Sequence, residues 1–193
     1  MSRVKVGVLI SGRGSNMSAL IAAAKAQDYP AEIALVISNV PDAGGLAAAR
    51  AEGVQTLAID SKSFAKDREA HERAMDAALR QAGVQVVCLA GFMRLLTPWF
   101  VEAWSGRLLN IHPSLLPDFK GLHTHARAIA AGKEEAGCSV HIVTAELDDG
   151  PILGQARVPV LLGDDEDALA ARVLKAEHRL YPQCLADFCR SLT

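Results

Sequence analysis

Neither charge dominates this sequence. Lysine and arginine together number 20 and aspartate and glutamate 22, so the formal net charge is −2. Proteins that bind nucleic acid or lie on a membrane surface usually show a basic stripe, so we expect neither kind of partner. No apolar run approaches the roughly 20 residues of a membrane-spanning helix. The N-terminal stretch MSRVKVGVLISG also lacks the apolar segment and small-residue cleavage site of a signal peptide.

Cysteine is scarce as well. The four cysteines form no CxxC pair and have no metal-ligand spacing. Cys88 and Cys138 stand in apolar, strand-like runs, so we interpret them as buried, reduced thiols. Half of the 193 residues are hydrophobic, which suits one domain with a substantial core. The composition therefore predicts a soluble, cytoplasmic protein with a single domain spanning residues 1–193.

Apolar runs typical of buried strands alternate with helical patterns along the chain. Strands are expected at 4–11, 31–38, 54–60, 84–91, 107–114, 138–145 and 154–161. Helices are expected at 15–27, 44–53, 66–83, 97–104 and 165–192, the last one bent or interrupted at Pro182. This order predicts an α/β fold: a single doubly wound, mostly parallel, Rossmann-like sheet with helices on both faces.

Three groups of unusual residues fall at the predicted carboxyl ends of strands, where such sheets bind ligands. They are SGRGSN (11–16), GFMRLL (91–96) and NIHPS (110–114). The first of them joins a strand to a helix, and backbone amides at a helix N-terminus attract anions. Met17 replaces the last glycine of GxGxxG, and no Walker lysine follows. The loop therefore favours a phosphate on a small substrate over a dinucleotide, and a tight, well-capped turn is the alternative.

The stretch RLLNIHPSLLPDFKG (107–121) suggests catalytic chemistry. Asn110 and His112 are two residues apart, so on a strand they project from the same face and can offer two N–H groups to one oxygen. A carboxylate would hold His112 charged and fix its tautomer. Asp148 in ELDDG is the best candidate, with Asp149 as an alternative. Prolines 113 and 117 would hold Asn110 and His112 in place. The other interpretation of His112 is a structural histidine that is hydrogen-bonded within the fold.

A metal site is another interpretation of residues 112–148, which contain four histidines and Asp148. The spacing does not match a known zinc pattern, since HExxH is absent and His123 and His125 are expected on a Gly/Thr loop. We therefore expect no metal.

NIHPSLLP followed by ELDDGPIL resembles the formyltransferase superfamily that uses 10-formyltetrahydrofolate, and the resemblance runs from Val4 to about the last helix. With VLISGRGSN and GLHTH, the chain is similar to the members that formylate 5-phosphoribosylglycinamide (glycinamide ribonucleotide) in de novo purine synthesis. DDG stands where related members often have DGG, but the D-x-G pattern survives. The resemblance implies a Rossmann-like formyltransferase fold, small-molecule substrates, 10-formyltetrahydrofolate as co-substrate, and a monomer or homodimer.

The resemblance also implies a role for individual residues. The catalytic ones would be Asn110, His112 and Asp148, and the loop for the substrate phosphate Gly14, Ser15 and Asn16. Glu177 would bind the substrate ribose, and the folate would contact Asn110, Arg68, Met93, Arg94, Leu95 and Leu96. Taken alone, Arg68 and Glu177 look like charges on solvated helix faces, and the apolar residues look like core or the cover of an apolar pocket.

The implied reaction is direct attack of the substrate amine on the formyl carbon through a tetrahedral oxyanion, without a covalent enzyme intermediate. The alternatives within the superfamily are a formyltetrahydrofolate deformylase and a methionyl-tRNA formyltransferase. The additional domains expected of those enzymes are not recognised in the sequence, and the net charge does not suit tRNA. A non-catalytic nucleotide-binding domain and a metal-dependent hydrolase are alternatives from other classes.

Overall fold

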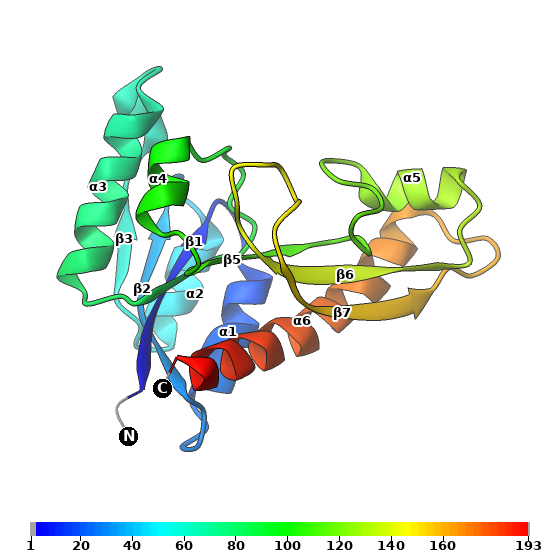
Figure 1. Ribbon diagram of the computed structural model, residues 1–193, viewed down its shortest axis with the longest axis horizontal. Helices are drawn as coiled ribbons and strands as arrows, with labels where there is room; N and C mark the ends of the chain where they lie inside the picture. The colour runs from blue at the N-terminus through cyan, green and yellow to red at the C-terminus, as the bar shows by residue number, and fades with distance from the viewer. Residues whose placement is uncertain (1–2, 193) are drawn as a thin grey trace.

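A seven-stranded sheet runs through the computed structural model, which describes residues 3–192 (Figure 1). Its strand order is β3-β2-β1-β4-β5-β6-β7. The strands are β1 (Val4–Ile10), β2 (Ala31–Ser38), β3 (Thr56–Ala58), β4 (Val86–Leu89), β5 (Leu108–His112), β6 (Glu135–Ile142) and β7 (Ile152–Pro159). Strands β1 to β5 pair in parallel, whereas β6 is antiparallel to both β5 and β7. The predicted mostly parallel sheet is confirmed.

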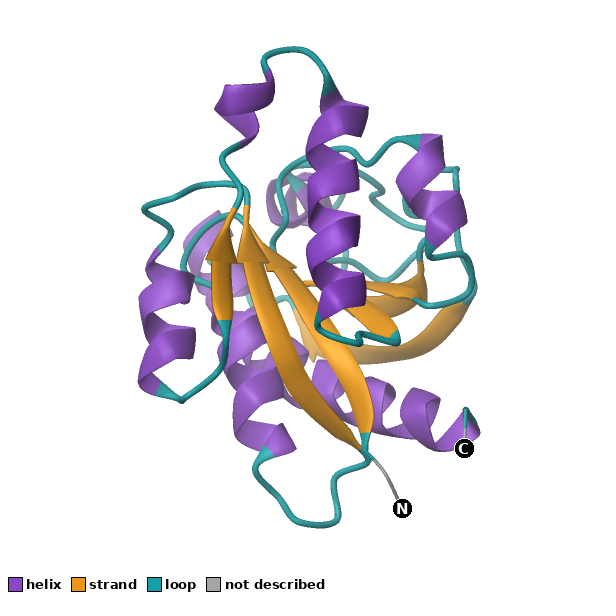
Figure 2. Ribbon diagram, turned by 90° about the vertical axis from the view of Figure 1, so that its left-hand side faces the viewer, coloured by secondary structure: helices purple, strands orange, loops and turns teal. Residues whose placement is uncertain are grey.

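Helices cover both faces of this sheet (Figure 2). On one face, α1 (Ser15–Ala24), α2 (Gly44–Ala51) and α6 (Glu166–Ser191) share a hydrophobic cluster with Val6, Val8 and Ile10. On the other, α3 (Arg68–Gln81) and α4 (Pro98–Ala103) pack against a second cluster that contains Leu9 and Leu89. A short helix, α5 (Thr124–Ala130), lies near α6, and a 3₁₀ turn, η1 (Ser61–Phe64), precedes α3. The doubly wound arrangement is therefore confirmed.

The continuous apolar run of β1 follows from its position between these two layers. Alternate residues of the strand enter opposite clusters, and a strand buried on both faces needs no polar alternation. Gly7 lies where a Cβ atom would be 2.4 Å from the Leu79 side chain, so the glycine permits close packing of α3 on the sheet.

Local structure differs from the sequence predictions at several places. Strand β3 is shorter than 54–60, and the N-cap of α1 is Gly14 in the left-handed conformation, without a side-chain hydrogen bond. Helix α6 continues through Pro182 because its buried face packs on the sheet over its whole length. The expected Gly/Thr loop at 121–126 is wrong in part, since His123 is the N-cap of α5 and His125 belongs to that helix. The helix formers in HARAIAA supply the physical reason.

The four cysteines are buried free thiols. Burial raises the pKa of Cys88 and of Cys138 to about 12, which keeps both protonated at neutral pH. Across residues 3–192, every helix is too short or too polar to span a bilayer.

Candidate active site

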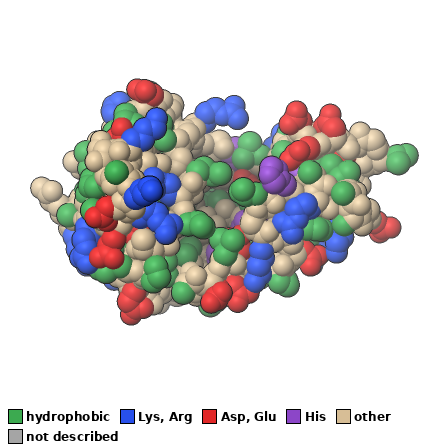
Figure 3. Space-filling view, turned by 90° about the horizontal axis from the view of Figure 1, so that it is seen from above, with side chains coloured by type: hydrophobic (Ala, Val, Ile, Leu, Met, Phe, Trp, Pro, Cys, Tyr) green, Lys and Arg blue, Asp and Glu red, His purple; other side chains and the backbone are tan. Residues whose placement is uncertain are grey.

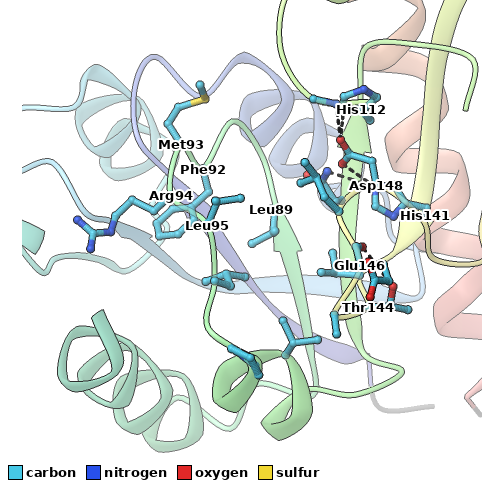
Figure 4. A pocket seen from close by; sticks show the side chains of 18 of the residues that line it. Leu89, Phe92, Met93, Arg94, Leu95, His112, His141, Thr144, Glu146 and Asp148 are labelled. Carbon is cyan, nitrogen blue, oxygen red and sulfur yellow. Dashed lines mark hydrogen bonds and ion pairs between the residues drawn. The ribbon is translucent and has the colours of Figure 1, made fainter. Parts of the chain in front are cut away.

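A cavity of about 560 Å³ opens beyond the carboxyl ends of β4 and β5. Seen from above, the molecule is hollowed near its middle, with apolar and histidine side chains around the depression (Figure 3). Its lining includes the apolar side chains of Leu89, Phe92, Leu96, Val101 and Val143. His112, His141 and Asp148 lie across the cavity from Leu89 and Phe92 (Figure 4), and Asn110 also lines the cavity. A concave apolar site with a few converging polar groups is typical of a small-molecule binding site.

Strand β5 supplies two of the predicted catalytic residues, Asn110 and His112, and the loop between β6 and β7 supplies Asp148. The His112 Nδ1 atom lies 3.5 Å from Oδ2 of Asp148, and both side chains are more than nine-tenths buried. Asp149 instead forms an exposed ion pair with Lys120. The structure therefore favours Asp148 over Asp149 as the partner of His112.

The backbone around Asp148 accounts for the D-x-G pattern. Asp148 has a positive φ of 49°, and its Oδ2 atom accepts a hydrogen bond from the Gly121 amide at 2.9 Å. At Gly150 a Cβ atom would lie 1.6 Å from the carbonyl oxygen of Ile142. Only glycine fits where the chain passes so close to the end of β6, and this turn directs the Asp148 carboxylate inward.

His141 belongs to the site, although the sequence suggested it only as a possible metal ligand. The antiparallel register of β5 and β6 pairs it with Asn110, and its Nε2 atom is 3.3 Å from Nδ2 of Asn110. Its Nδ1 atom is 3.1 Å from the Ile142 carbonyl oxygen, which favours the tautomer with Nδ1–H donating and Nε2 accepting from Asn110. Burial lowers the pKa of His141, which favours this neutral form.

His112 is held differently from the sequence expectation. Its Nε2 atom is 3.0 Å from the carbonyl oxygen of Phe119, so Nε2–H donates to the backbone and does not point into the cavity. With Nδ1 facing Asp148, both ring nitrogens face acceptors, an arrangement that a doubly protonated imidazole satisfies. The sequence could not indicate this contact, because Phe119 reaches His112 only through the fold of the 113–123 loop.

The glycine loop and Glu177 come together where α1 meets α6, on the face of the sheet that these two helices cover. Nδ2 of Asn16 donates to Oε2 of Glu177 at 2.7 Å, across 161 positions of sequence, and both side chains are buried. Glu177 is thus not the surface ion-pair residue that its neighbours in the sequence suggest. Gly14, Ser15, Asn16 and Glu177 lie outside the lining of the large cavity. The loop is connected to the cavity through Ser11, whose Oγ atom accepts from the Met93 amide at 2.8 Å.

Burial raises the pKa of Glu177, and the hydrogen bond from Asn16 only partly opposes this. Between the ordinary glutamate pKa and the raised value the folded protein binds more protons than the unfolded chain, so stability falls as pH rises through that window.

We expect Glu177→Gln to increase the free energy of unfolding at pH 7.5 by about 1 kcal/mol, because a buried charge is removed. Urea unfolding at pH 7.5 and pH 4 measures this. The increase in the free energy of unfolding should be smaller at pH 4, where Glu177 is closer to neutral. An equal increase at both pH values would contradict the prediction.

The predicted folate residues occupy the segment between β4 and α4. Met93 and Leu95 are 71% and 65% exposed at the cavity rim, and Leu96 is half-buried. Arg94 lines the cavity, but its guanidinium points away from the catalytic residues (Figure 4). Arg68 does not line the cavity, although its Nη1 atom approaches the Leu95 carbonyl oxygen at 3.4 Å. The buried carboxylate of Glu72 accepts from the amide and hydroxyl of Thr97 and fixes the end of this segment.

Metal-ligating side chains do not converge in the described part of the chain. Between residues 3 and 192 there is no group of three or more His, Cys, Asp or Glu side chains placed to hold an ion. His123 is exposed at the start of α5, away from the cavity lining.

Comparison with known proteins shows which proteins this chain resembles. Residues 4–185 match the formyl transferase family. Phosphoribosylglycinamide formyltransferase of Escherichia coli is 48% identical over 96% of this chain and 87% of its own length. The trifunctional purine biosynthetic protein adenosine-3 of Drosophila melanogaster is 50% identical over 95% of this chain, which spans only 14% of that longer protein.

Solved structures also resemble this chain. The crystal structure of phosphoribosylglycinamide formyltransferase from Brucella melitensis has a TM-score of 0.93 and 57% identity, covering 97% of this chain and 96% of that one. Glycinamide ribonucleotide transformylase 1 from Symbiobacterium toebii has a TM-score of 0.94 at 44% identity, covering 98% and 89%. On this sequence match and this structural agreement, the chain belongs to the formyl transferase family.

Proposed function

We propose that this protein transfers the formyl group of 10-formyltetrahydrofolate to the amine of glycinamide ribonucleotide, a step of de novo purine synthesis. The observation that carries the proposal is the convergence of Asn110, His112 and Asp148 in the lining of an apolar cavity. The relatives that bear the name of this activity support the choice of substrates. We further propose one cytoplasmic domain over residues 1–193, a monomer or homodimer acting on small molecules.

The reaction begins when the substrate amine attacks the formyl carbon on N10 of the folate. The formyl oxygen becomes an oxyanion, and groups that stabilise it must already be oriented. One N–H of the Asn110 amide is directed to Nε2 of His141, and the amide carries a second N–H that can donate to the oxyanion. A protonated His112 adds positive charge beside the same position while its own N–H groups remain on Phe119 and Asp148.

Asp148 serves the proton transfer. The attacking nitrogen must lose a proton and the leaving N10 must gain one, so a carboxylate beside the reaction centre can move the proton between them, directly or through water. The hydrogen bond from the Gly121 amide and the nearby His112 ring fix the position of the Asp148 carboxylate. Since the nucleophile is the substrate's own amine, the proposed chemistry draws on no metal and no enzyme nucleophile.

The glycine loop and Glu177 would hold the ribonucleotide. Helix α1 starts at Ser15 directly after Gly14, so the backbone amides of its first turn can bind the phosphate. The buried Oδ1 atom of Asn16 has no hydrogen-bond partner among the described residues. An acceptor atom beside the Glu177 carboxylate suits the hydroxyl groups of a ribose, so Asn16 would contribute its backbone to the phosphate and its side chain to the sugar.

The exposed segment Met93–Leu95 and the apolar lining of the cavity would hold the folate. The cavity has a volume suited to a flat ring system with an attached aryl group, and its apolar side chains exclude water around it. Arg68 and Arg94 would interact with the negative tail of the folate at the cavity mouth, because Arg68 is exposed and the half-buried Arg94 has its guanidinium turned away from His112 and Asp148.

Ser15→Asp tests the phosphate site. A carboxylate at the N-terminus of α1 would stabilise the helix but repel a phosphate, so we expect KM for glycinamide ribonucleotide to rise at least tenfold, with KM for the folate within twofold. Steady-state kinetics at low ionic strength measures both. Ser18→Asp, one turn further along the same exposed face, is the control; an equal rise in that variant would assign the effect to general charge repulsion.

The function itself is tested by following absorbance as a 10-formylfolate analogue loses its formyl group, with and without glycinamide ribonucleotide. Loss that requires the amine is the expected result. Release of formate without the amine would identify a deformylase on the same scaffold. Absence of reaction under both conditions would contradict the proposal.

A further inference from the structure

The segment of residues 118–122, between β5 and α5, touches both members of the catalytic pair through its backbone. The carbonyl oxygen of Phe119 accepts from Nε2 of His112 at 3.0 Å, and the amide of Gly121 donates to Oδ2 of Asp148 at 2.9 Å. The conformation of this segment therefore sets the ring orientation of His112 and the direction of the Asp148 carboxylate. A displacement near 1 Å at such a site can cost orders of magnitude in rate.

The backbone of the segment is held in a conformation that it would not adopt unsupported. Phe119 has a φ of 53°, and His123, directly after the segment, has a φ of 56°. Positive φ is unfavourable for residues with a Cβ atom and persists only where surrounding contacts impose it. Something outside the segment must therefore stabilise this shape.

Arg127 supplies those contacts from the first turns of α5. Its Nη1 atom donates to the carbonyl oxygens of Lys120 and Leu122, at 2.7 Å and 3.2 Å, on either side of Gly121. Its guanidinium also lies over the ring of Phe119, 5.3 Å from the centroid. The side chain is exposed and is not part of the cavity lining, so it reaches the catalytic residues only through this backbone.

We propose that Arg127 is a positioning residue, which fixes the 118–122 segment so that Phe119 orients His112 and Gly121 orients Asp148. A planar guanidinium can stack on a ring and donate in its own plane at once, whereas the compact ammonium of lysine cannot reproduce both contacts. Lys133 makes a second contact with this segment, through an ion pair with Asp118 and the Phe119 ring at 5.7 Å. As far as it concerns turnover, the proposal rests on the proposed function.

The test compares Arg127→Gln and Arg127→Lys with Arg157→Gln. Arg157 is a matched control because it is also exposed and its Nη1 atom pairs with Glu135, on the strands β6 and β7 away from the cavity. We expect Arg127→Gln to lower kcat about tenfold with both KM values within twofold, and Arg127→Lys to recover part of the loss. The imidazole ¹⁵N chemical shifts of His112, assigned by their loss in His112→Asn, should change in Arg127→Gln and not in Arg157→Gln.

Two results would overturn the proposal: kcat of Arg127→Gln within twofold of Arg157→Gln, or His112 resonances identical to those of the unmodified protein. If Arg127→Gln lost kcat together with a lower unfolding midpoint but left the His112 resonances unchanged, the loss would reflect stability alone. That outcome would also overturn the proposal. The NMR measurement needs no substrate. If the unmodified protein lacked transferase activity, the proposed function would fail, while the effect of Arg127 on His112 would still be decided.

Discussion

Asp148→Asn is expected to lower kcat by about 10³–10⁴-fold while the affinity for the folate changes by less than about threefold. Asparagine has the same shape, so its side-chain oxygen can still accept from the Gly121 amide and the turn before Gly150 can persist. It cannot take up the proton of the attacking amine, and it removes the negative charge 3.5 Å from Nδ1 of His112. The effect should therefore fall on turnover and not on binding.

Single-turnover kinetics measures the rate of the chemical step, and titration with a folate analogue measures the binding affinity separately. Asp149→Asn is the control, because Asp149 is the adjacent residue, carries the same charge and lies exposed in an ion pair with Lys120. It should retain kcat within about twofold. An active Asp148→Asn enzyme would overturn the role of Asp148, and an equal loss in Asp149→Asn would show that the net charge of the loop, not one carboxylate, matters.

Asn110→Ala is expected to lower kcat by about 10²–10³-fold, the usual cost of removing one oxyanion donor. The substitution removes the N–H proposed to meet the oxyanion and also the donor to Nε2 of His141. The charge developing on the formyl oxygen exists only in the transition state and intermediate, so KM for the ribonucleotide should change little.

Gln183→Ala is a suitable control, because it removes an amide from the exposed face of α6, where its Nε2 atom donates to Asp187. Rates and unfolding midpoints of both variants would be compared. Equal losses of rate would contradict the assignment. The double variant Asn110→Ala, Asp148→Asn should lose far less than the product of the single losses, because the residues act on one intermediate.

The fold was largely predictable because its signals are local. A buried parallel strand is apolar throughout, and helix formers with a glycine stop mark α3, so periodicity alone located these elements. Helix α5 is not evident from the sequence because it is short and begins between His123 and His125 in a glycine-containing stretch. An interruption of α6 at Pro182 is wrong, since the packing of the buried face of the helix outweighs the loss of one backbone hydrogen bond.

The candidate site was predictable only where its residues are close in sequence or carry a motif. Asn110 and His112 follow from the period of a strand, and Asp148 from its pattern with Gly150. His141 depends on the antiparallel register of β6, and the Phe119 carbonyl depends on a left-handed residue in a loop. Neither is encoded in a local pattern, so both required the three-dimensional structure.

The bond between Asn16 and Glu177 gives the substrate site a particular order of assembly. It joins the first helix of the chain to the last, and α6 also anchors the sheet through Tyr181, whose hydroxyl donates to the carbonyl oxygens of Leu89 and Leu109. On a ribosome, Asn110, His112 and Asp148 emerge before α6, which carries Glu177. A nascent chain that ends before α6 would carry the proposed catalytic residues without the proposed ribose site, so the proposed activity can begin only after α6 has been made and has packed on the sheet.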